Sequence, residues 1–167
     1  MADLKYLEVQ IVTHFDGSKD RLDTYKNLET AHDAEVRFEK NMGNDIAGEN
    51  NKTVLNIALS NDGEEVAGCN EFYSKVPTGT VEDVIKYYHI MWTTKVDETA
   101  DSIDVKAYDD YETAEISHHV KMGAALDNDN TKTALSKIYN SHGGAVMSKY
   151  RDLYPEPEPP IPPVDGE

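Results

Sequence analysis

The residues best suited to chemistry in this sequence are carboxylates that gather between positions 97 and 115. This stretch of 19 residues holds eight acidic side chains and a single basic one, Lys106, so its net charge is −7. The eight are Asp97, Glu98, Asp101, Asp104, Asp109, Asp110, Glu112 and Glu115. Exposed carboxylates in rows attract basic proteins and can occupy a basic channel built for a phosphate backbone. We expect these residues to form a partner-binding surface of that kind, or else a solvated hairpin face whose acids favour the start of a helix.

No other cluster gives a recognisable catalytic or metal site. His118 and His119 are neighbours, and adjacent helical side chains point about 100° apart, so the pair cannot chelate one ion. The run from Asp127 begins like a calcium loop, but Lys132 stands where such a loop needs glycine. Cys69 is the only cysteine, which excludes a disulfide within the chain. Glycine-rich phosphate loops and nucleophile elbows are absent from the sequence. The sequence thus favours a protein that is not an enzyme and needs no metal or cofactor.

Acidity extends over the whole chain. Its 167 residues include 32 acidic and 16 basic ones, a net charge of −16, with −7 in residues 1–76, −5 in 77–154 and −4 in 155–167. Gripping a nucleic-acid backbone needs clustered Lys and Arg, so we expect no direct nucleic-acid binding. No stretch approaches the ~20 apolar residues that cross a bilayer, and the first residues lack the layout of a signal peptide. Together with the lone cysteine, these features predict a protein of a reducing cytoplasm that does not bind membranes.

A long internal repeat determines the expected architecture. "ETAHDAEVRFEKNMGNDIAGENNKTVL" at 29–55 returns as "ETAEISHHVKMGAALDNDNTKTAL" at 112–135. Before each copy, residues 6–13 and 87–94 alternate apolar and polar side chains, which is typical of a half-buried strand, and polar turns follow. After each copy, the residues at 61–63 (Asn-Asp-Gly) and 142–144 (His-Gly-Gly) favour tight hairpin turns. Each copy is therefore predicted to fold as a ββαββ module.

The predicted helix of each module has a start signal and an end signal. Asn27 and Asp110 are good N-cap types, and Gly43 and Gly123 are typical of the residue that follows a helix. Between the shared "ETA" and "MG" the offset of the two copies falls from 83 to 80, which predicts that the second helix is about one turn shorter. Each helix is expected to cover one face of its own sheet.

The predicted fold class is α+β, a tandem duplication of a ββαββ module with antiparallel sheets, each covered by one helix, in a pseudo-twofold arrangement. A single module of about 75 residues would have a thin core, so the two copies are expected to pack on each other. Their sheets could join edge to edge or stack face to face. The predicted boundaries are 1–76 for the first module, 77–86 for a linker, 87–154 for the second module and 155–167 for a proline-rich, extended tail.

The seam between the modules offers a second kind of site. Tyr87, Tyr88 and Trp92 fall on the first strand of the second module. If the seam leaves a cleft, these rings could stack a nucleotide, because aromatic side chains bind the flat faces of bases.

The strand, cap and turn signals together resemble a family of short acidic proteins encoded in prophages of gut Firmicutes. The features are the tyrosine-rich strand at 6–13, the helix entry from Asn27 to Ala31, Gly43, the Asn-Asp-Gly turn at 61–63 and the Pro/Glu tail at 155–163. The second copy repeats all but the Asn-Asp-Gly turn. The resemblance implies a phage origin and carries no catalytic residues. Small acidic phage proteins include inhibitors of host nucleases and CRISPR effectors that act by binding.

We therefore expect a non-enzymatic, phage-encoded binding protein in the host bacterial cytoplasm, an inhibitor of a host defence nuclease of anti-CRISPR or anti-restriction type. Its partner would be a basic host protein such as a nuclease or a CRISPR effector. The sequence is also compatible with a homodimer. Two alternatives remain. One is a virion or assembly component whose proline-rich tail docks to a partner, and the other is a small-molecule sponge that binds a nucleotide signal at the seam.

Overall fold

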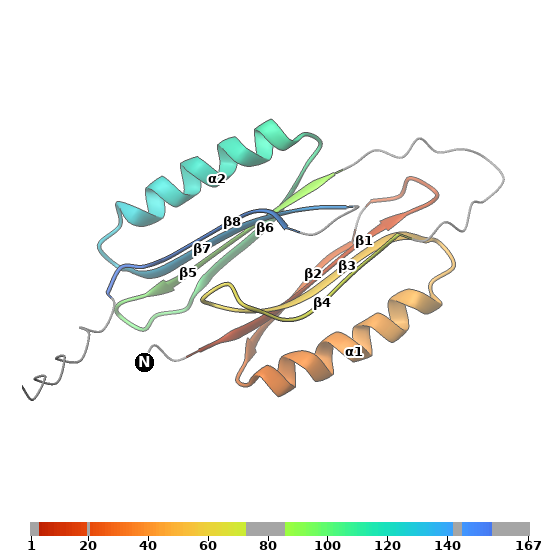
Figure 1. The fold of residues 1–167 in the computed structure, drawn as a ribbon, viewed down its shortest axis with the longest axis horizontal. Coiled ribbons are helices and arrows are strands. Elements are labelled where there is room, and N and C mark those ends of the chain that lie inside the picture. Colours follow the sequence, from red (N-terminus) through yellow and green to blue (C-terminus); the bar gives the residue numbers. More distant parts are fainter. Residues whose placement is uncertain (1–3, 20, 73–85, 142–144, 155–167) are drawn as a thin grey trace, which may run out of the picture.

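The chain folds as two copies of one module, each with the order strand, strand, helix, strand, strand (Figure 1). The computed structural model describes residues 4–19, 21–72, 86–141 and 145–154. The first module contains β1 (Tyr6–His14), β2 (Arg21–Leu28), α1 (Ala31–Ala47), β3 (Asn51–Ser60) and β4 (Glu65–Phe72). The second contains β5 (Tyr87–Lys95), β6 (Ser102–Tyr108), α2 (Tyr111–Leu126), β7 (Thr131–Asn140) and β8 (Ala145–Asp152).

Each module forms one four-stranded antiparallel sheet. The strand orders are β2-β1-β3-β4 and β6-β5-β7-β8, so the two sheets have the same topology. The helix connects the edge strand of the first hairpin to the inner strand of the second, and it packs on the sheet of its own module. The predicted α+β fold, a duplicated ββαββ module, is confirmed.

The two sheets stack face to face, which decides between the two packings that the sequence left open. Alternate residues of β1 and β5 point into the space between the sheets, and both helices lie on the outer sides (Figure 1). The buried residues of this shared core are Leu7, Val9, Ile11, Leu55, Ile57, Leu59, Tyr88, Ile90, Trp92, Leu135 and Tyr139. Burial of these apolar side chains is the main force that holds the modules together.

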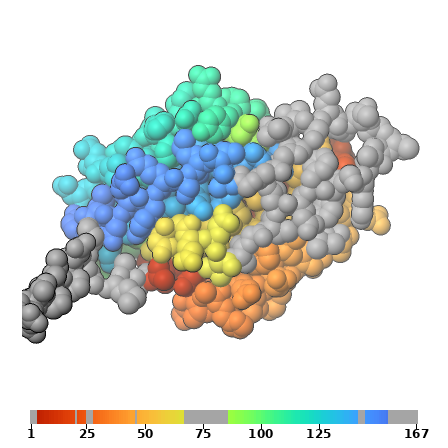
Figure 2. Space-filling model, viewed as in Figure 1, coloured from red at the N-terminus to blue at the C-terminus, as the bar shows by residue number. Residues whose placement is uncertain are grey.

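Polar contacts also join the two sheets, between β7 of the second module and β4 of the first. Tyr139 Oη of β7 donates a hydrogen bond to Glu65 Oε1 of β4 at 2.7 Å, and Lys137 Nζ lies 3.5 Å from the same oxygen. In Figure 2 the second module's β8 (blue) lies directly against the β3–β4 end of the first module (yellow). Burial and the neighbouring carboxylate raise the pKa of Tyr139, so its hydroxyl stays a donor.

A β-bulge in β2 changes the offset between the two copies by one residue. β1 and β2 pair in regular register from Val12–Arg21 to Glu8–Tyr25, but Tyr6 then pairs with Leu28, which leaves one extra residue in β2. The β5–β6 pair has no such shift. The offset is therefore 81 for the first strands and 80 from the helices onward.

The expected helix ends are corrected. Asp110 caps α2 as predicted, with Oδ1 accepting from Thr113 N at 2.7 Å, but the cap of α1 is Thr30 and not Asn27, which lies in β2. Both helices run past Gly43 and Gly123, to Ala47 and Leu126, and have 17 and 16 residues. Neither glycine adopts a positive φ, and the buried side chains that follow keep the last turn packed on the sheet. The helices thus differ by one residue, and the prediction of a full turn was wrong.

Other predicted features fall outside the described residues. These are most of the linker at 77–86, the turn at 142–144 and the tail at 155–167. Neither helix of the described residues is long and apolar enough to cross a membrane.

Candidate functional site

The structure divides the acidic cluster into two groups. Asp97, Glu98 and Asp101 lie on or beside the β5–β6 turn, whereas Asp109, Asp110 and Glu112 lie where β6 leads into α2. The seven residues of β6 separate the groups by ~20 Å, at a rise of ~3.3 Å per residue. The remaining two acids are Asp104, in the middle of β6, and Glu115, half-buried on α2. The eight residues therefore form a strip along β6 and not one compact patch.

Asp101 is a structural residue that joins the modules. Its Oδ1 accepts from Lys5 Nζ of the first module at 2.9 Å, and its Oδ2 accepts from Trp92 Nε1 at 3.1 Å. The side chain is only 13% exposed. The expectation that Asp101 faces water is thus corrected, because its carboxylate satisfies a buried indole N–H.

Three further acids make contacts within the second module. Hydrogen bonds from the Thr99 hydroxyl and backbone lower the pKa of Asp97, and the Thr113 backbone N–H and then its hydroxyl lower the pKa of Asp110. Asp104 forms an ion pair with Lys121 of α2.

Six of the eight acids are exposed, all but Asp101 and Glu115, and three of the six have no partner among the described residues. Glu98, Asp109 and Glu112 are exposed, and their side chains have no hydrogen bond or ion pair within the described part of the chain.

A pocket of about 590 Å³ lies where the modules meet. Its walls come from the beginning of β1 and end of β2 in the first module, and from β5, β6 and their turn in the second. The apolar lining residues are Leu4, Tyr6, Leu28, Trp92, Ala100 and Ile103, and the charged ones are Lys5, Glu29, Glu98 and Asp101. We call this the seam pocket. Its volume lies in the range of ligand-binding pockets.

The predicted aromatic site does not form. Tyr88 is fully buried between the sheets, and Trp92, though it lines the seam pocket, is 2% exposed. Tyr87 packs edge-on against Tyr111, with ring centroids 5.6 Å apart. Tyr88 and Trp92 lie on one face of β5, buried between the sheets, whereas Tyr87 lies on the opposite face because the side chains of a strand alternate. They cannot together stack a nucleotide.

Glu98 at the rim of the seam pocket has an unusual backbone. Its φ is +59°, the left-handed region, and the corresponding turn residue of the first module is Gly17, with a φ of +72°. Glycine adopts this conformation without steric cost, whereas a residue with a Cβ does not. The second module thus carries a carboxylate where the first has the residue that best fits the turn.

A chain of buried polar side chains lies beneath α2, and no sequence motif predicts it. His89 Nε2 of β5 and His118 Nδ1 of α2 lie 2.6 and 2.7 Å from Ser136 Oγ of β7. On its other side His89 Nδ1 lies 3.1 Å from Ser117 Oγ, which accepts from Tyr108 Oη at 2.7 Å. Burial, with nearby Lys121 and His118, lowers the pKa of His89 to about 4, so the ring is neutral near pH 7. Because Ser136 is fully buried, this serine–histidine contact is closed to a substrate.

The same place beneath α1 holds a buried acid. Glu8 of β1, equivalent to His89, is fully buried and accepts from Asn41 Nδ2 at 2.8 Å through both oxygens. Burial raises the pKa of Glu8, while Asn41, Asn56 and nearby Arg37 act in the opposite direction. Asn56 Oδ1, also buried, has no hydrogen-bond donor.

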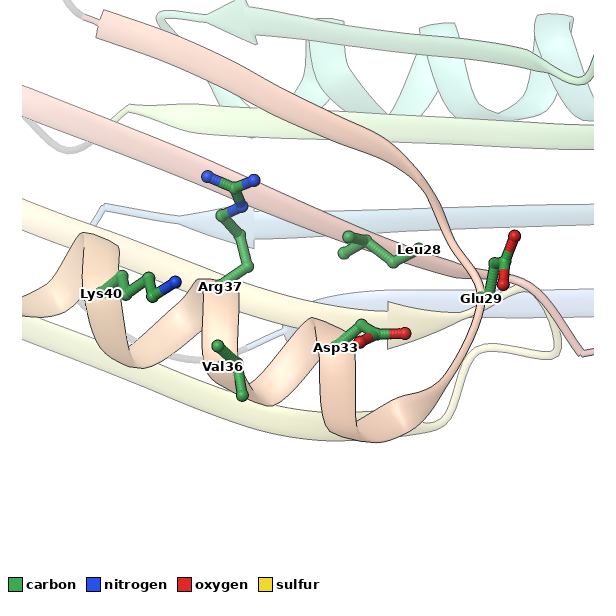
Figure 3. Close-up of a pocket in the computed structure, with 6 residues that line it drawn as sticks. All are labelled: Leu28, Glu29, Asp33, Val36, Arg37 and Lys40. Carbon is green, nitrogen blue, oxygen red and sulfur yellow. The ribbon is translucent and has the colours of Figure 1, made fainter.

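A shallow hollow of about 330 Å³ lies between the end of β2 and α1 (Figure 3). It is lined by Leu28, Glu29, Asp33, Val36, Arg37 and Lys40. Two acids and two bases balance one another there, so the hollow has no preference for a charged ligand.

Within the described residues, no three His, Cys, Asp or Glu side chains lie close enough to hold a metal ion. His118 is buried and His119 exposed, while His142 and the side chain of Cys69 lie outside what the structure describes. In comparisons with known proteins, no family model, no curated protein and no solved structure matches the chain.

Proposed function

We propose that this is a non-enzymatic binding protein whose second module engages a basic partner protein. The binding surface is formed by Asp104, Asp109, Asp110 and Glu112, and we call it the acidic strip. The observation that carries the proposal is the exposure of all four carboxylates along β6 and the first turn of α2. An exposed row of carboxylates raises the rate at which a basic protein associates and aligns it on the surface.

The internal repeat supports this choice of surface. The corresponding residues of the first module are Asp23, Glu29, Thr30 and His32, so two of the four acids are replaced by uncharged or weakly basic side chains. The fold needs an N-cap at position 110, which Thr30 also provides, but it needs no acid at position 112. The additional negative charge of the second module is therefore not a requirement of the fold.

We further propose that the partner is a host defence nuclease or CRISPR effector and that the protein is a phage-encoded inhibitor. What supports this is the net charge of −16, the resemblance to acidic prophage proteins, and the basic channel that such nucleases use to hold nucleic acid. Inhibition would need only occupation of that channel, without covalent chemistry.

The test compares two triple variants of equal charge change. One, Asp104→Asn with Asp109→Asn and Glu112→Gln, alters the acidic strip. The other, Glu35→Gln with Glu39→Gln and Glu49→Gln, alters exposed acids of the first module. A partner is captured from a bacterial host lysate, purified, and its association rate with each variant is measured at two salt concentrations.

We expect the strip variant to slow association by on the order of tenfold and the control to leave it unchanged. Association of the unaltered protein should also slow with added salt, because the Debye length is ~10 Å at 0.1 M. The proposed function would be contradicted by a partner whose association rate changes neither with salt nor with the strip variant. It would also be contradicted by a captured nuclease whose activity does not fall when this protein is added.

A further inference from the structure

We propose that the seam pocket binds a small organic cation, a primary amine or guanidine carried on an apolar body. The pocket is separate from the acidic strip, because its lining contains none of the four residues of the strip. The inference therefore does not depend on the identity of a protein partner.

The size and the walls of the pocket favour a ligand with an apolar body. About 590 Å³ is more than one side chain fills and falls within the range that holds a small molecule. Tyr6 and Leu28 of the first module line this space together with Trp92 and Ile103 of the second. Apolar surface from both modules would thus cover the body of the ligand.

The charges of the pocket select a cation. Its only base, Lys5, is already paired with Asp101, at 2.9 Å. Glu29 and Glu98 remain, and within the described part of the chain neither carboxylate has an ion pair. With two uncompensated negative charges, the site repels a phosphate or carboxylate and attracts an ammonium or guanidinium group. The nucleotide expected from the aromatic residues is therefore replaced by a ligand of opposite charge.

Glu98 and Trp92 of the seam pocket have no chemical equivalents in the first module. The residues of the first module that correspond to Glu98 and Trp92 are Gly17 and Ile11. Neither replacement disturbs the strand or the turn, since both modules form the same β-hairpin. The shared fold therefore does not dictate these two residues of the seam pocket.

Trp92 allows a direct test, because it is the only tryptophan of the chain and lines the pocket. The intact protein is titrated with 2-phenylethylamine, and separately with 3-phenylpropionate, which has a similar apolar body and the opposite charge. Tryptophan fluorescence is recorded at low and high salt. The amine should give a saturable change that weakens with salt, and the carboxylate should give none.

Two double variants test whether Glu29 and Glu98 bind the cation. Glu29→Gln with Glu98→Gln should weaken amine binding by about fivefold or more, which is what loss of two exposed charge contacts implies. Glu35→Gln with Glu39→Gln changes the net charge equally on the exposed face of α1 and should leave the affinity unchanged. The acidic-strip variant should also bind the amine normally, so that failure of the pocket and failure of the proposed function give different results.

Three outcomes would overturn the proposal. The first is the absence of a saturable response to the amine, and the second is an equal response to the carboxylate. The third is an affinity that the Glu29 and Glu98 substitutions do not change.

Discussion

Acidification should destabilise the folded protein through His89 of the second module. The imidazole is fully buried, and its two nitrogens lie 2.6 and 3.1 Å from the hydroxyls of Ser136 and Ser117. A protonated ring would be a cation without a carboxylate in direct contact, since Asp104 is the only nearby group that favours the charged form while Lys121 and His118 oppose it. The perturbation is a change from about pH 8 to about pH 5, applied to the unaltered protein and to His89→Gln.

The magnitude follows from the two pKa values. In the unfolded chain the pKa of His89 is 6.5, and in the folded protein it is about 4. The unfolded state therefore binds a proton first as the pH falls, so this group's contribution to stability is complete above pH 6.5 and is lost toward pH 4. At pH 5 the loss is about 2 kcal/mol. His118, whose pKa burial also lowers, acts in the same direction.

The assay is chemical denaturation at both pH values. The free energy of unfolding of the unaltered protein, relative to His89→Gln, should fall by about 2 kcal/mol between pH 8 and pH 5, because charge effects common to both proteins cancel. An NMR titration gives a second measurement that does not depend on the variant's folding: the His89 ring should remain neutral at pH 5. Parallel pH profiles for the two proteins, or a ring that titrates near 6.5, would refute the reasoning.

Three other substitutions have predictable effects on stability. Glu98→Gly should stabilise the protein by about 1 kcal/mol, since glycine adopts the left-handed turn without strain, and an unchanged or lower melting temperature would contradict this. Asp110→Ala should cost about 1 kcal/mol in urea denaturation through loss of the α2 cap, whereas Asp110→Asn should cost much less; equal losses would exclude capping as the cause. Glu8→Gln should raise stability at pH 8 by about 1 kcal/mol, because it removes a buried charge while its amide oxygen can still accept from Asn41 Nδ2. The raised pKa of Glu8 means that its cost disappears as the pH falls, so this gain should shrink on acidification, and a constant gain would argue against it.

Local patterns predicted the elements of the fold well. Alternation along residues 6–13 and 87–94 identified two inner strands, and Asp110 was recognisable as a cap by its residue type and place. Thr30 was missed because the two Glu-Thr-Ala stretches match best at an offset of 83, whereas the helix starts correspond at an offset of 80, from Thr30 to Asp110. The helix ends predicted at Gly43 and Gly123 were wrong. A glycine ends a helix only where the residues after it do not pack as a further helical turn, and here they do.

The candidate site depended on contacts between distant residues, which one sequence does not reveal. Asp101 looked like a solvated acid of a charged run, yet its partner Lys5 is 96 residues away. The strand period places Tyr88 and Trp92 on one face of β5, but whether that face meets water, a ligand or another sheet depends on how the modules pack. The chain of His89, Ser136 and His118 could have been suspected only from polar residues at apolar-facing positions of two strands and a helix.

The duplication also fixes how many ligands one molecule can hold. A symmetric dimer of a single module would repeat every residue, so it would carry two identical pockets and could bridge two ligands or bind them cooperatively. In the fused chain Glu98 stands opposite Gly17, and Trp92 opposite Ile11. The residues proposed to bind the ligand therefore occur at one end of the seam only, and the proposal predicts one ligand per chain. Its saturation curve should be a simple hyperbola, and its capacity to remove a ligand from solution should be one equivalent per chain.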